Sequence, residues 1–404
     1  MDLEEQVATL MQGTEYGDAA LRQAMETELR ERLIEADKAG RPLRVYCGFD
    51  PRTTDLHIGH TVPMRKLRQF QDFGHEVTFL VGTFTSLIGD PSDKDKLRPQ
   101  LTLEEAEENG RTYAEQAYRV LDKTKIKVQF NAEWLSKLTF ADVIHMASNF
   151  TVQQFLGREN FRLRFDKGDP IYLHETFYAL MQAYDAYALK ADVQVGGTDQ
   201  LFNIVTAGRK LMSAMGEKPN IGVILGILPG TDGEIKMSKS LGNHIPLNTN
   251  AEDMYGKVMS VPDKAMPDYF RMVTRWTASE VAERLTAIES GKVHPRDAKM
   301  ELAREITAVF YSEAEAEQAQ AEFVRVFQKG KLPEDMPEYA LEAGQTVLDV
   351  LEAGGLVSSR GEGRRLLKQN GVRLDGDTLS DPDQLFPHAG VLQAGKRRFL
   401  KVVE

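Results

Sequence analysis

The chain of 404 residues is poor in cysteine, because Cys47 is the only one. A single thiol excludes an intrachain disulfide and any metal site built from several cysteines. The sequence also has no run of 18 apolar residues, and its acidic start, MDLEEQVATL, lacks the basic and apolar regions of a signal peptide. These absences predict a cytoplasmic protein that does not enter a membrane.

Two common nucleotide-binding signatures are absent as well. The sequence has neither a GxxxxGK[ST] loop nor the GxGxxG turn of dinucleotide-binding folds. An excess of positive charge is also missing, since the formal net charge is −11, which argues against a chain that coats nucleic acid along its whole length. Residues 341–404 differ from the rest, because nine Lys and Arg balance nine Asp and Glu there. A local basic patch is therefore compatible with the acidic total.

Strand-like and helical segments alternate from residue 43 to residue 230. Strands are predicted at LRVYCGFD, EVTFLVGTF, KIKVQF, ADVQVGG and NIGVILGIL, with amphipathic stretches between them. This alternation predicts a parallel sheet covered by helices, with ligands beyond the carboxyl ends of the strands. Residues 96–190 are long for one crossover, so we expect an inserted helical region. The pattern is helical over 249–332, and KLPEDMPEYA reads as a linker before short helices and strands over 341–404.

The stretch DPRTTDLHIGHTVPMRKL, residues 50–67, places two histidines and a glycine at the start of an expected helix. A helix N-terminus presents unpaired N–H groups and the positive end of the helix dipole, which favour phosphate. Gly59 leaves room for a flat ring, and His57 and His60 share one helix face. On its own, such a pair is more often structural or metal-binding than nucleotide-binding.

A basic loop, GEIKMSKSLGN, follows the last predicted strand at residues 233–243. Lys236 and Lys239 are flexible cations between two glycines and suit a phosphate chain, although a solvated loop is the commoner explanation. Together, HIGH and KMSKS resemble the two signatures of the class I aminoacyl-tRNA synthetases. The segments YCGFDPRTTDLHIGH, LIGDPSDK, YALMQAYD and VGGTDQLFN resemble active-site segments of the tyrosyl-tRNA synthetase family, and the likeness covers nearly the whole chain.

The resemblance implies an α/β fold and an activity. The expected order is a Rossmann-like parallel-sheet catalytic domain with a helical insertion (1–230), the KMSKS loop (231–248), an α-helical anticodon-binding domain (249–332) and a small α+β RNA-binding module (341–404). The implied reaction joins tyrosine to tRNA(Tyr) through tyrosyl-adenylate. ATP with Mg²⁺ is a substrate, no permanently bound cofactor is expected, no metal-binding residues are predicted, and the implied assembly is a homodimer.

Candidate residues for the tyrosine substrate come partly from spacing. Tyr178, Gln182 and Asp185 fall on one face of a helix that is otherwise apolar, which suggests a lined cavity, although a wet surface face has the same pattern. By resemblance, Asp185 accepts a hydrogen bond from the substrate phenol with Tyr46 on its other side. The remaining tyrosine-binding candidates, for the ammonium and carboxylate groups, are Tyr178, Gln182, Asp90 and Gln200.

The resemblance also supplies the candidates for ATP. The residues expected to act in catalysis are His57, His60, Lys236 and Lys239, and these four also bind ATP. Asp50 opens the turn before the HIGH motif, and the other expected ATP contacts are Gly48, Gly59, Gly197, Asp199, Met237 and Ser238. One departure from the family pattern is Arg52, where a threonine is expected.

Basic residues gather near the end of the chain in SSRGEGRRLLKQNGVRLDG, which resembles the S-four RNA-binding module. A solvated helix face would explain any one of them. The candidate RNA-binding residues are Arg360, Arg364, Arg365, Lys368 and Arg373, and a second group is Lys396, Arg397, Arg398 and Lys401. Such a patch would contact RNA phosphate and shape.

Two other functions remain open at this point. One is a related ligase, such as a tryptophan enzyme, against which the Tyr46–Asp185 pair and the basic tail argue. The other is a non-catalytic RNA-binding paralogue, against which the intact HIGH and KMSKS motifs argue. Amino-acid-dependent pyrophosphate exchange separates the three.

Overall fold

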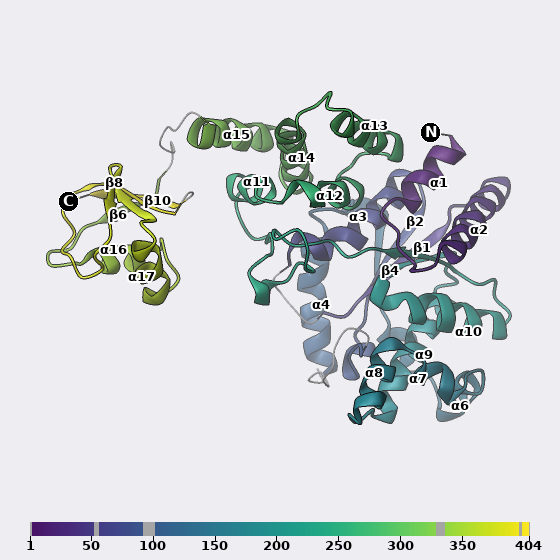
Figure 1. Cartoon of the computed structure of the whole chain (residues 1–404). Coiled ribbons are helices and arrows are strands. Elements are labelled where there is room, and N and C mark those ends of the chain that lie inside the picture. The colour runs from purple at the N-terminus through teal and green to yellow at the C-terminus, as the bar shows by residue number, and fades with distance from the viewer. Residues whose placement is uncertain (1, 52–55, 92–101, 329–335, 396–397, 404) are drawn as a thin grey trace. The chain divides into compact units, whose positions relative to one another are not determined.

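The structure, a computed structural model, describes residues 2–51, 56–91, 102–328, 336–395 and 398–403 (Figure 1). It divides into two compact units, Met1–Gln320 and Ala321–Glu404. Among the described residues, no helix is long and apolar enough to cross a membrane.

The first unit is built on a five-stranded parallel sheet with the order β3-β2-β1-β4-β5. The strands are β1 (Arg44–Phe49), β2 (Glu76–Val81), β3 (Ile126–Phe130), β4 (Val193–Gly197) and β5 (Ile221–Leu225). Their inner residues, such as Val77, Phe79 and Val223, are buried, as expected of a sheet covered on both faces. The predicted strands and the predicted parallel sheet are confirmed. The strand order reverses between β1 and β4, which is where open sheets of this kind bind ligands.

The helices before and between the first strands are set by local signals. Asp18 caps α2 by accepting bonds from the N–H groups of Ala20 and Leu21, and Thr102 with Glu105 caps α4. The helices of this part are α1 (Leu3–Met11), α2 (Ala19–Lys38), α3 (Ile58–Asp72), η1 (Thr85–Leu87), α4 (Leu103–Ala117) and η2 (Lys123–Lys125).

The expected helical insertion lies between β3 and β4. Its helices pack around Phe161, Ala179 and Leu180, which are buried in one apolar cluster. The elements of the insertion are α5 (Ala132–Leu135), α6 (Phe140–Ala147), α7 (Val152–Leu156), α8 (Glu159–Lys167) and α9 (Leu173–Ala188). Between β4 and β5 lie η3 (Thr198–Gln200), η4 (Phe202–Gly208) and α10 (Arg209–Ala214). Figure 1 shows α6 to α9 gathered on the side of the sheet away from α11 to α14.

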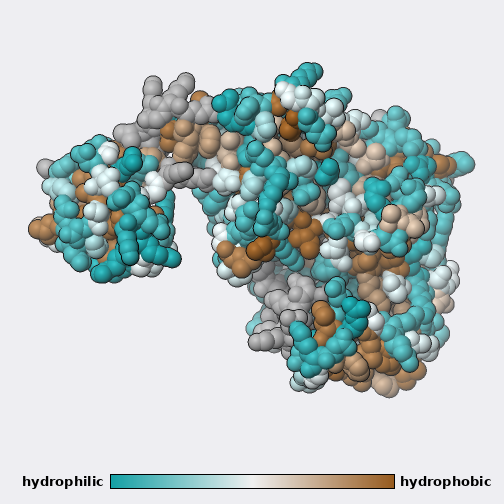
Figure 2. All heavy atoms as spheres, viewed as in Figure 1, coloured by the Kyte–Doolittle hydropathy of each residue, from teal (hydrophilic) through white to brown (hydrophobic). Residues whose placement is uncertain are grey.

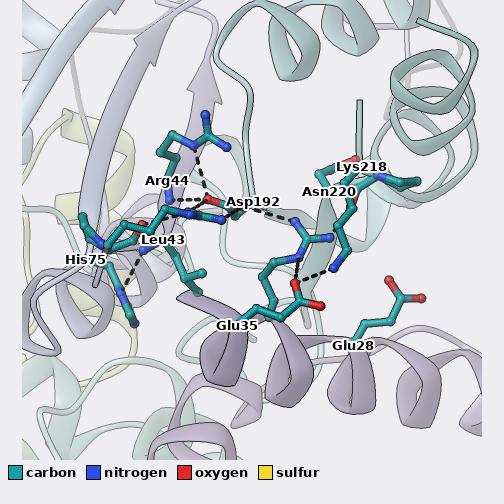
Figure 3. A network of polar contacts seen from close by, with 12 residues as sticks. Glu28, Glu35, Leu43, Arg44, His75, Asp192, Lys218 and Asn220 are labelled. Carbon is teal, nitrogen blue, oxygen red and sulfur yellow. Dashed lines mark hydrogen bonds and ion pairs between the residues drawn. The ribbon is translucent and has the colours of Figure 1, made fainter. Parts of the chain in front are cut away.

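An ion cluster ties the amino ends of the central strands to α2. The carboxylate of Asp192, just before β4, accepts bonds from Arg32 at 3.2 Å, Arg41 at 2.8 Å and the backbone N–H of Arg44 at 2.9 Å (Figure 3). Burial alone would raise the pKa of Asp192, but the bonds from Arg41 and Arg44 outweigh it and lower the pKa to about 2. The cluster therefore stabilises the scaffold at the end of the sheet opposite the carboxyl ends.

The chain beyond β5 is helical, as predicted. A loop with η5 (Lys239–Leu241) leads to α11 (Ala251–Met259), η6 (Asp263–Ala265), α12 (Met266–Met272), α13 (Ala278–Glu289), α14 (Pro295–Phe310), α15 (Glu313–Phe323) and η7 (Val324–Gln328). Tyr255, Tyr269 and Phe270 are fully buried and supply much of the apolar core of these helices.

The second unit contains the small α+β module. Its elements are β6 (Glu338–Ala340), α16 (Val347–Ala353), α17 (Arg360–Lys368), β7 (Val372–Leu374), β8 (Asp377–Leu379), β9 (Gly390–Ala394) and β10 (Arg398–Val403). The sheet order is β6-β10-β9-β7-β8, and Leu348, Leu367 and Leu400 are buried between the sheet and the helices. Because β6 pairs with β10, this sheet begins at Glu338, before the expected start of the module at residue 341.

Candidate active site

A cavity of about 240 Å³ lies at the carboxyl ends of β1 and β4, between these strands and α9. Its position fits the switch point of the sheet. Ten of the residues predicted from the sequence line it: Tyr46, Gly48, Asp50, Asp90, Tyr178, Gln182, Asp185, Gly197, Asp199 and Gln200. Residues that are up to 154 positions apart, from Tyr46 to Gln200, thus meet around one space.

Asp185 and Tyr46 form a buried polar pair in the wall of this cavity. Asp185 Oδ1 accepts a hydrogen bond from Trp134 Nε1 at 2.7 Å, and Oδ2 accepts one from Asn131 Nδ2 at 3.2 Å. The hydroxyl of Tyr46 is buried and has no hydrogen-bond partner among the described residues. A buried hydroxyl without a partner is costly, so the pair is suited to a ligand that brings a hydroxyl of its own.

The electrostatics of this pair follow from burial. Burial raises the pKa of Asp185 to about 7, although the bonds from Trp134 and Asn131 oppose the rise. Burial, and after it the nearby Asp185, raises the pKa of Tyr46 well above its usual value, so Tyr46 stays a neutral donor. Sequence reasoning did not identify Asn131 and Trp134, because they lie in the segment NAEWL, which carries no recognised motif.

A second polar network lines the cavity around Gln200. Its Nε2 donates to Asp90 Oδ2 at 2.5 Å and to Asp199 Oδ2 at 3.0 Å. Asn203 Nδ2 donates to Gln182 Oε1 at 2.9 Å and to Gln200 Oε1 at 3.0 Å. Two carboxylates and two amide oxygens converge here, and such acceptors suit an ammonium group, which has only donors. Asn203 belongs to the segment VGGTDQLFN, but the sequence predicted no role for it. Asn203 is fully buried, and its two hydrogen bonds link the two glutamines.

Tyr178 is tied to Asp50 in the cavity wall. Its hydroxyl donates to Asp50 Oδ2 at 3.1 Å, and Thr85 donates to Asp50 Oδ1 at 3.0 Å. Gly82 makes this arrangement possible, because a Cβ there would lie 2.3 Å from Asp50 Oδ1 and 2.4 Å from the Thr85 hydroxyl. Tyr178 was expected beside a substrate ammonium and Asp50 beside ATP. The bond between them joins those two parts of the site.

The two histidines of the HIGH motif lie together at the start of α3. Their rings stack with centroids 3.8 Å apart, and the backbone N–H of His57 donates to His60 Nδ1 at 3.2 Å. Because Nδ1 of His60 accepts, its other nitrogen, Nε2, carries the proton and is a donor. Burial, followed by the neighbouring His60, His244 and Lys236, lowers the pKa of His57 to about 3. Burial and Lys236 lower the pKa of His60 to about 4, so both rings are neutral at pH 7.

The KMSKS loop lies against this motif. A Cβ at Gly59 would be 3.5 Å from Cβ of Met237, which is itself buried. The loop is held by Asn243, whose Oδ1 accepts from the N–H of Ser238 at 2.8 Å, and by a bond from the N–H of Met237 to the carbonyl of Leu228 at 3.2 Å. Lys236 is near enough to lower the pKa of both HIGH histidines. The structure therefore brings the two motifs together.

The predicted RNA-binding residues of the second unit fall into two kinds. Arg360 forms ion pairs with Asp349 at 2.7 Å and Glu352 at 3.3 Å, and so links α17 to α16. Arg364, Arg365, Lys368 and Arg373 are exposed, and Arg364 lies 3.8 Å from Asp383. Of the second basic group, Arg398 pairs with Glu362 and Lys401 with Glu338. Three residues of interest lie outside the described part of the chain: Arg52, Lys396 and Arg397.

The sequence has extensive similarity to proteins of one family. Residues 38–328 match the family model described as tRNA synthetases class I (W and Y). The chain is 45% identical to the tyrosine–tRNA ligase of Moorella thermoacetica over 403 residues, covering 99% of this chain and 97% of the relative. It is 44% identical to the tyrosine–tRNA ligase of Oleidesulfovibrio alaskensis over 407 residues, covering all of both chains.

Solved structures share the fold. The C-terminally truncated mitochondrial tyrosyl-tRNA synthetase of Aspergillus nidulans superposes with a TM-score of 0.63 at 23% identity, covering 80% of this chain and 94% of that chain. The tyrosyl-tRNA synthetase of Archaeoglobus fulgidus, complexed with L-tyrosine, gives 0.59 at 23% identity, covering 79% and 100%. With a parallel sheet, adjoining HIGH and KMSKS motifs and full-length relatives, the chain belongs to the class I tRNA synthetase family of the tryptophan and tyrosine enzymes.

Proposed function

We propose that this chain is a tyrosine–tRNA ligase that uses ATP and forms AMP and pyrophosphate. In the first step, an oxygen of the tyrosine carboxylate attacks the α-phosphorus of ATP. The bond from that phosphorus to the β-phosphate oxygen breaks, and pyrophosphate leaves with the bonding electrons. In the second step, a hydroxyl of the terminal ribose of tRNA(Tyr) attacks the carbonyl carbon of tyrosyl-adenylate, and AMP leaves.

The observation that carries this proposal is the pair of Tyr46 and Asp185. A substrate phenol would donate its O–H to the carboxylate of Asp185. It would accept from the hydroxyl of Tyr46, which has no partner in the described part of the chain. An indole offers no oxygen to this pair. A phenyl ring leaves the buried Tyr46 hydroxyl without a ligand partner and gives Asp185 no bond beyond those from Trp134 and Asn131. The pair therefore favours tyrosine over tryptophan and phenylalanine.

The rest of the cavity suits the other end of the amino acid. Asp90, Gln182 and Gln200 supply the acceptors for its ammonium group, and they are held by the bonds around Asn203. Fixing the phenol and the ammonium group orients the carboxylate, because the carboxylate and the ammonium are carried by the same carbon. The carboxylate is already a nucleophile, so catalysis consists of alignment and of stabilising charge on the phosphates.

The phosphate side of the site is formed by the two signature motifs. His60 Nε2 is a neutral donor, and Lys236 and Lys239 supply positive charge that offsets the charge on the leaving pyrophosphate. Gly48, Asp50, Gly197 and Asp199 line the cavity between this region and the amino-acid end, where the adenosine part of ATP would lie. Mg²⁺ enters as part of the nucleotide substrate, held mainly by phosphate oxygens and water. The three substrates meet in the cytoplasm, where we place the enzyme.

The proposed assembly is a homodimer formed through the helical insertion. This region exposes large apolar side chains, including Phe140 at 79%, Val152 at 71% and Leu173 at 73% of their surface. Figure 2 shows hydrophobic residues gathered over the lower part of the first unit, where α6 to α9 lie. Exposed apolar clusters of this kind mark protein interfaces. Sedimentation of wild type and of a Phe140→Asp, Leu173→Asp variant tests it, and a wild-type monomer at micromolar concentration would contradict the assignment.

The function itself is tested by pyrophosphate exchange with single amino acids. We expect ATP–pyrophosphate exchange with tyrosine and much slower exchange with tryptophan or phenylalanine. Faster exchange with tryptophan would assign the chain to the other enzyme of its family. No exchange with any amino acid, in a folded protein, would mean that catalysis has been lost.

A further inference from the structure

His244 lies five residues after Lys239, on a segment that pairs with the HIGH motif. The N–H of Ile58 donates to the carbonyl of Ile245 at 2.9 Å, and the N–H of Leu247 donates to the carbonyl of Leu56 at 2.9 Å. These bonds enclose His57, which faces Pro246 in an antiparallel bridge. The backbone thus holds His244 at a fixed place beside the start of α3.

The ring of His244 lies close to the HIGH histidines. Its centroid is 6.2 Å from that of His57, and the planes are inclined by 59°. Nδ1 of His244 is buried and has no hydrogen-bond partner among the described residues, and Nδ1 of His57 is in the same condition. Two imidazole nitrogens without partners, on adjoining rings, are costly to bury unless a ligand satisfies them.

The groups that face His244 are cationic or neutral. Lys239 approaches from the KMSKS loop and Lys257 from α11, while His57 is neutral. Lys257 is paired with Asp253 at 2.7 Å, and that carboxylate is directed to the lysine. Burial, followed by Lys257 and Lys239, lowers the pKa of His244, so the ring is a neutral donor at pH 7. Positive charge around a hydrogen-bond donor favours an anion.

We propose that His244 is a third histidine of the ATP site and that its ring N–H hydrogen-bonds the pyrophosphate group as it leaves. This inference rests on the proposed function, since it assigns a further residue to the same reaction. It explains why a polar ring stands five residues after Lys239, within the loop that carries the KMSKS motif. It also explains why two buried nitrogens have no partners among the residues that the structure describes. His244 acts with His57 and His60 from the opposite strand of the bridge.

The test compares His244→Phe with His244→Asn. Phenylalanine keeps the ring and its packing but has no donor, whereas the amide nitrogen of asparagine can replace Nδ1–H. A hydrogen bond to a charged group corresponds to about a 10- to 100-fold change in rate. We expect the Phe variant to lose this factor in kcat of tyrosine-dependent exchange or in kcat/KM for ATP. The Asn variant should recover most of it, and KM for tyrosine should not change in either.

Controls separate this inference from the proposed function. His388→Phe alters an exposed histidine of the second unit and should match wild type. If wild type itself lacks exchange with tyrosine, the proposed function fails, whatever the variants do. If wild type is active and the Phe variant equals it, His244 has no role in catalysis. If both variants lose activity equally, the role of His244 is structural and the inference is wrong. The same conclusion follows if the loss of activity is accompanied by changes in KM for tyrosine and in the melting temperature.

Discussion

Trp134 Nε1 lies 2.7 Å from Asp185 Oδ1 and donates a hydrogen bond to it. The bond holds the carboxylate in place. Asp185 also lines the cavity, where its oxygens can accept a further hydrogen bond from a ligand. Trp134 thus acts through Asp185 and is a positioning residue for the proposed recognition of the phenol. Asn131, at the end of β3, donates to the other oxygen of Asp185 and so also positions the carboxylate. Its Nδ2 donates to the hydroxyl of Thr85 as well, at 3.2 Å.

The first prediction concerns Trp134→Phe. The variant keeps an aromatic ring but has no donor, and removing a bond to a charged acceptor costs about 1.5–3 kcal/mol. We expect kcat/KM for tyrosine in exchange to fall by about 10-fold or more, with phenylalanine little affected, so that the selectivity ratio falls. Trp276→Phe, in the helical region after β5, is the matched control. An unchanged ratio of tyrosine to phenylalanine would remove Trp134 from substrate recognition.

The contrast between these residues and the motif residues shows what the sequence can reveal. Strand runs were sufficient to predict the parallel sheet. The resemblance of the segments YCGFDPRTTDLHIGH, LIGDPSDK, YALMQAYD and VGGTDQLFN supplied ten residues of the cavity wall. Asn131 and Trp134 were not predicted from the sequence, because they are 54 and 51 residues away from Asp185 along the chain. Nothing within NAEWL itself indicates that β3 ends beside α9. Such roles depend on tertiary distances, which local patterns do not contain.

Arg360 illustrates the same limit in the second unit. Its charge and its place in a basic stretch predicted RNA binding together with Arg364 and Arg365. In the folded unit its guanidinium is paired with Asp349 and Glu352, eleven and eight residues earlier. Spacing along α17 shows which residues share a helix face. It does not show that α16 brings the carboxylates of Asp349 and Glu352 to Arg360.

The second prediction follows from that difference. Arg365→Gln should weaken tRNA binding and reduce the slope of log affinity against log salt by about 0.7–0.9, because the protein then neutralises one phosphate fewer. Arg360→Gln should change this slope less, since Asp349 and Glu352 already neutralise its charge. Filter binding across a salt series measures both. Equal slopes for the two variants would show that the ion pairs of Arg360 open on RNA.

The third prediction concerns the Asp192 cluster and stability. Asp192 and Arg32 are both buried, and removing one partner of a buried pair costs about 3–5 kcal/mol. We expect Asp192→Asn to lower the free energy of unfolding of the first unit by about this amount at pH 7. Both tryptophans, Trp134 and Trp276, lie in that unit, so their fluorescence reports its unfolding alone.

The pH dependence of this effect has a definite sign. Asp192 has a pKa of about 2 when folded, below the ordinary aspartate value of 3.8, so its contribution is present above that ordinary value and disappears as pH falls towards 2. The difference between wild type and Asp192→Asn should shrink over this range. Asp72→Asn, which removes an exposed pair with Arg68, is the control and should cost about 0–1 kcal/mol. A difference that stays constant down to about pH 2 would contradict the ionic explanation.

The fourth prediction concerns Lys239→Ala. If the ammonium group of Lys239 meets the phosphates mainly in the transition state, adenylate formation should slow by about 10²–10³ while tyrosine binding stays the same. Pre-steady-state formation of tyrosyl-adenylate and equilibrium binding of tyrosine measure the two quantities. Lys218→Ala, which removes a surface pair with Glu35, should match wild type. A rate within a few-fold of wild type would make the KMSKS loop an ordinary solvated loop.

The last prediction separates the two units by truncation. A chain that ends at Gln328 keeps every element of the first unit and omits the whole sheet of the second, whereas a cut at residue 340 would leave β6 without its partner β10. The tyrosine and ATP residues predicted from the sequence end at Lys239, and the proposed ATP-site residue His244 also lies before the cut, so tyrosine-dependent exchange should remain. Affinity for tRNA should fall, and its salt slope should flatten by about 0.7–0.9 for each phosphate that the missing cations would have neutralised. Unchanged tRNA affinity would show that the second unit is not an RNA-binding module. Loss of exchange as well would show that the catalytic fold depends on that unit, and the two roles would no longer be separable by domain.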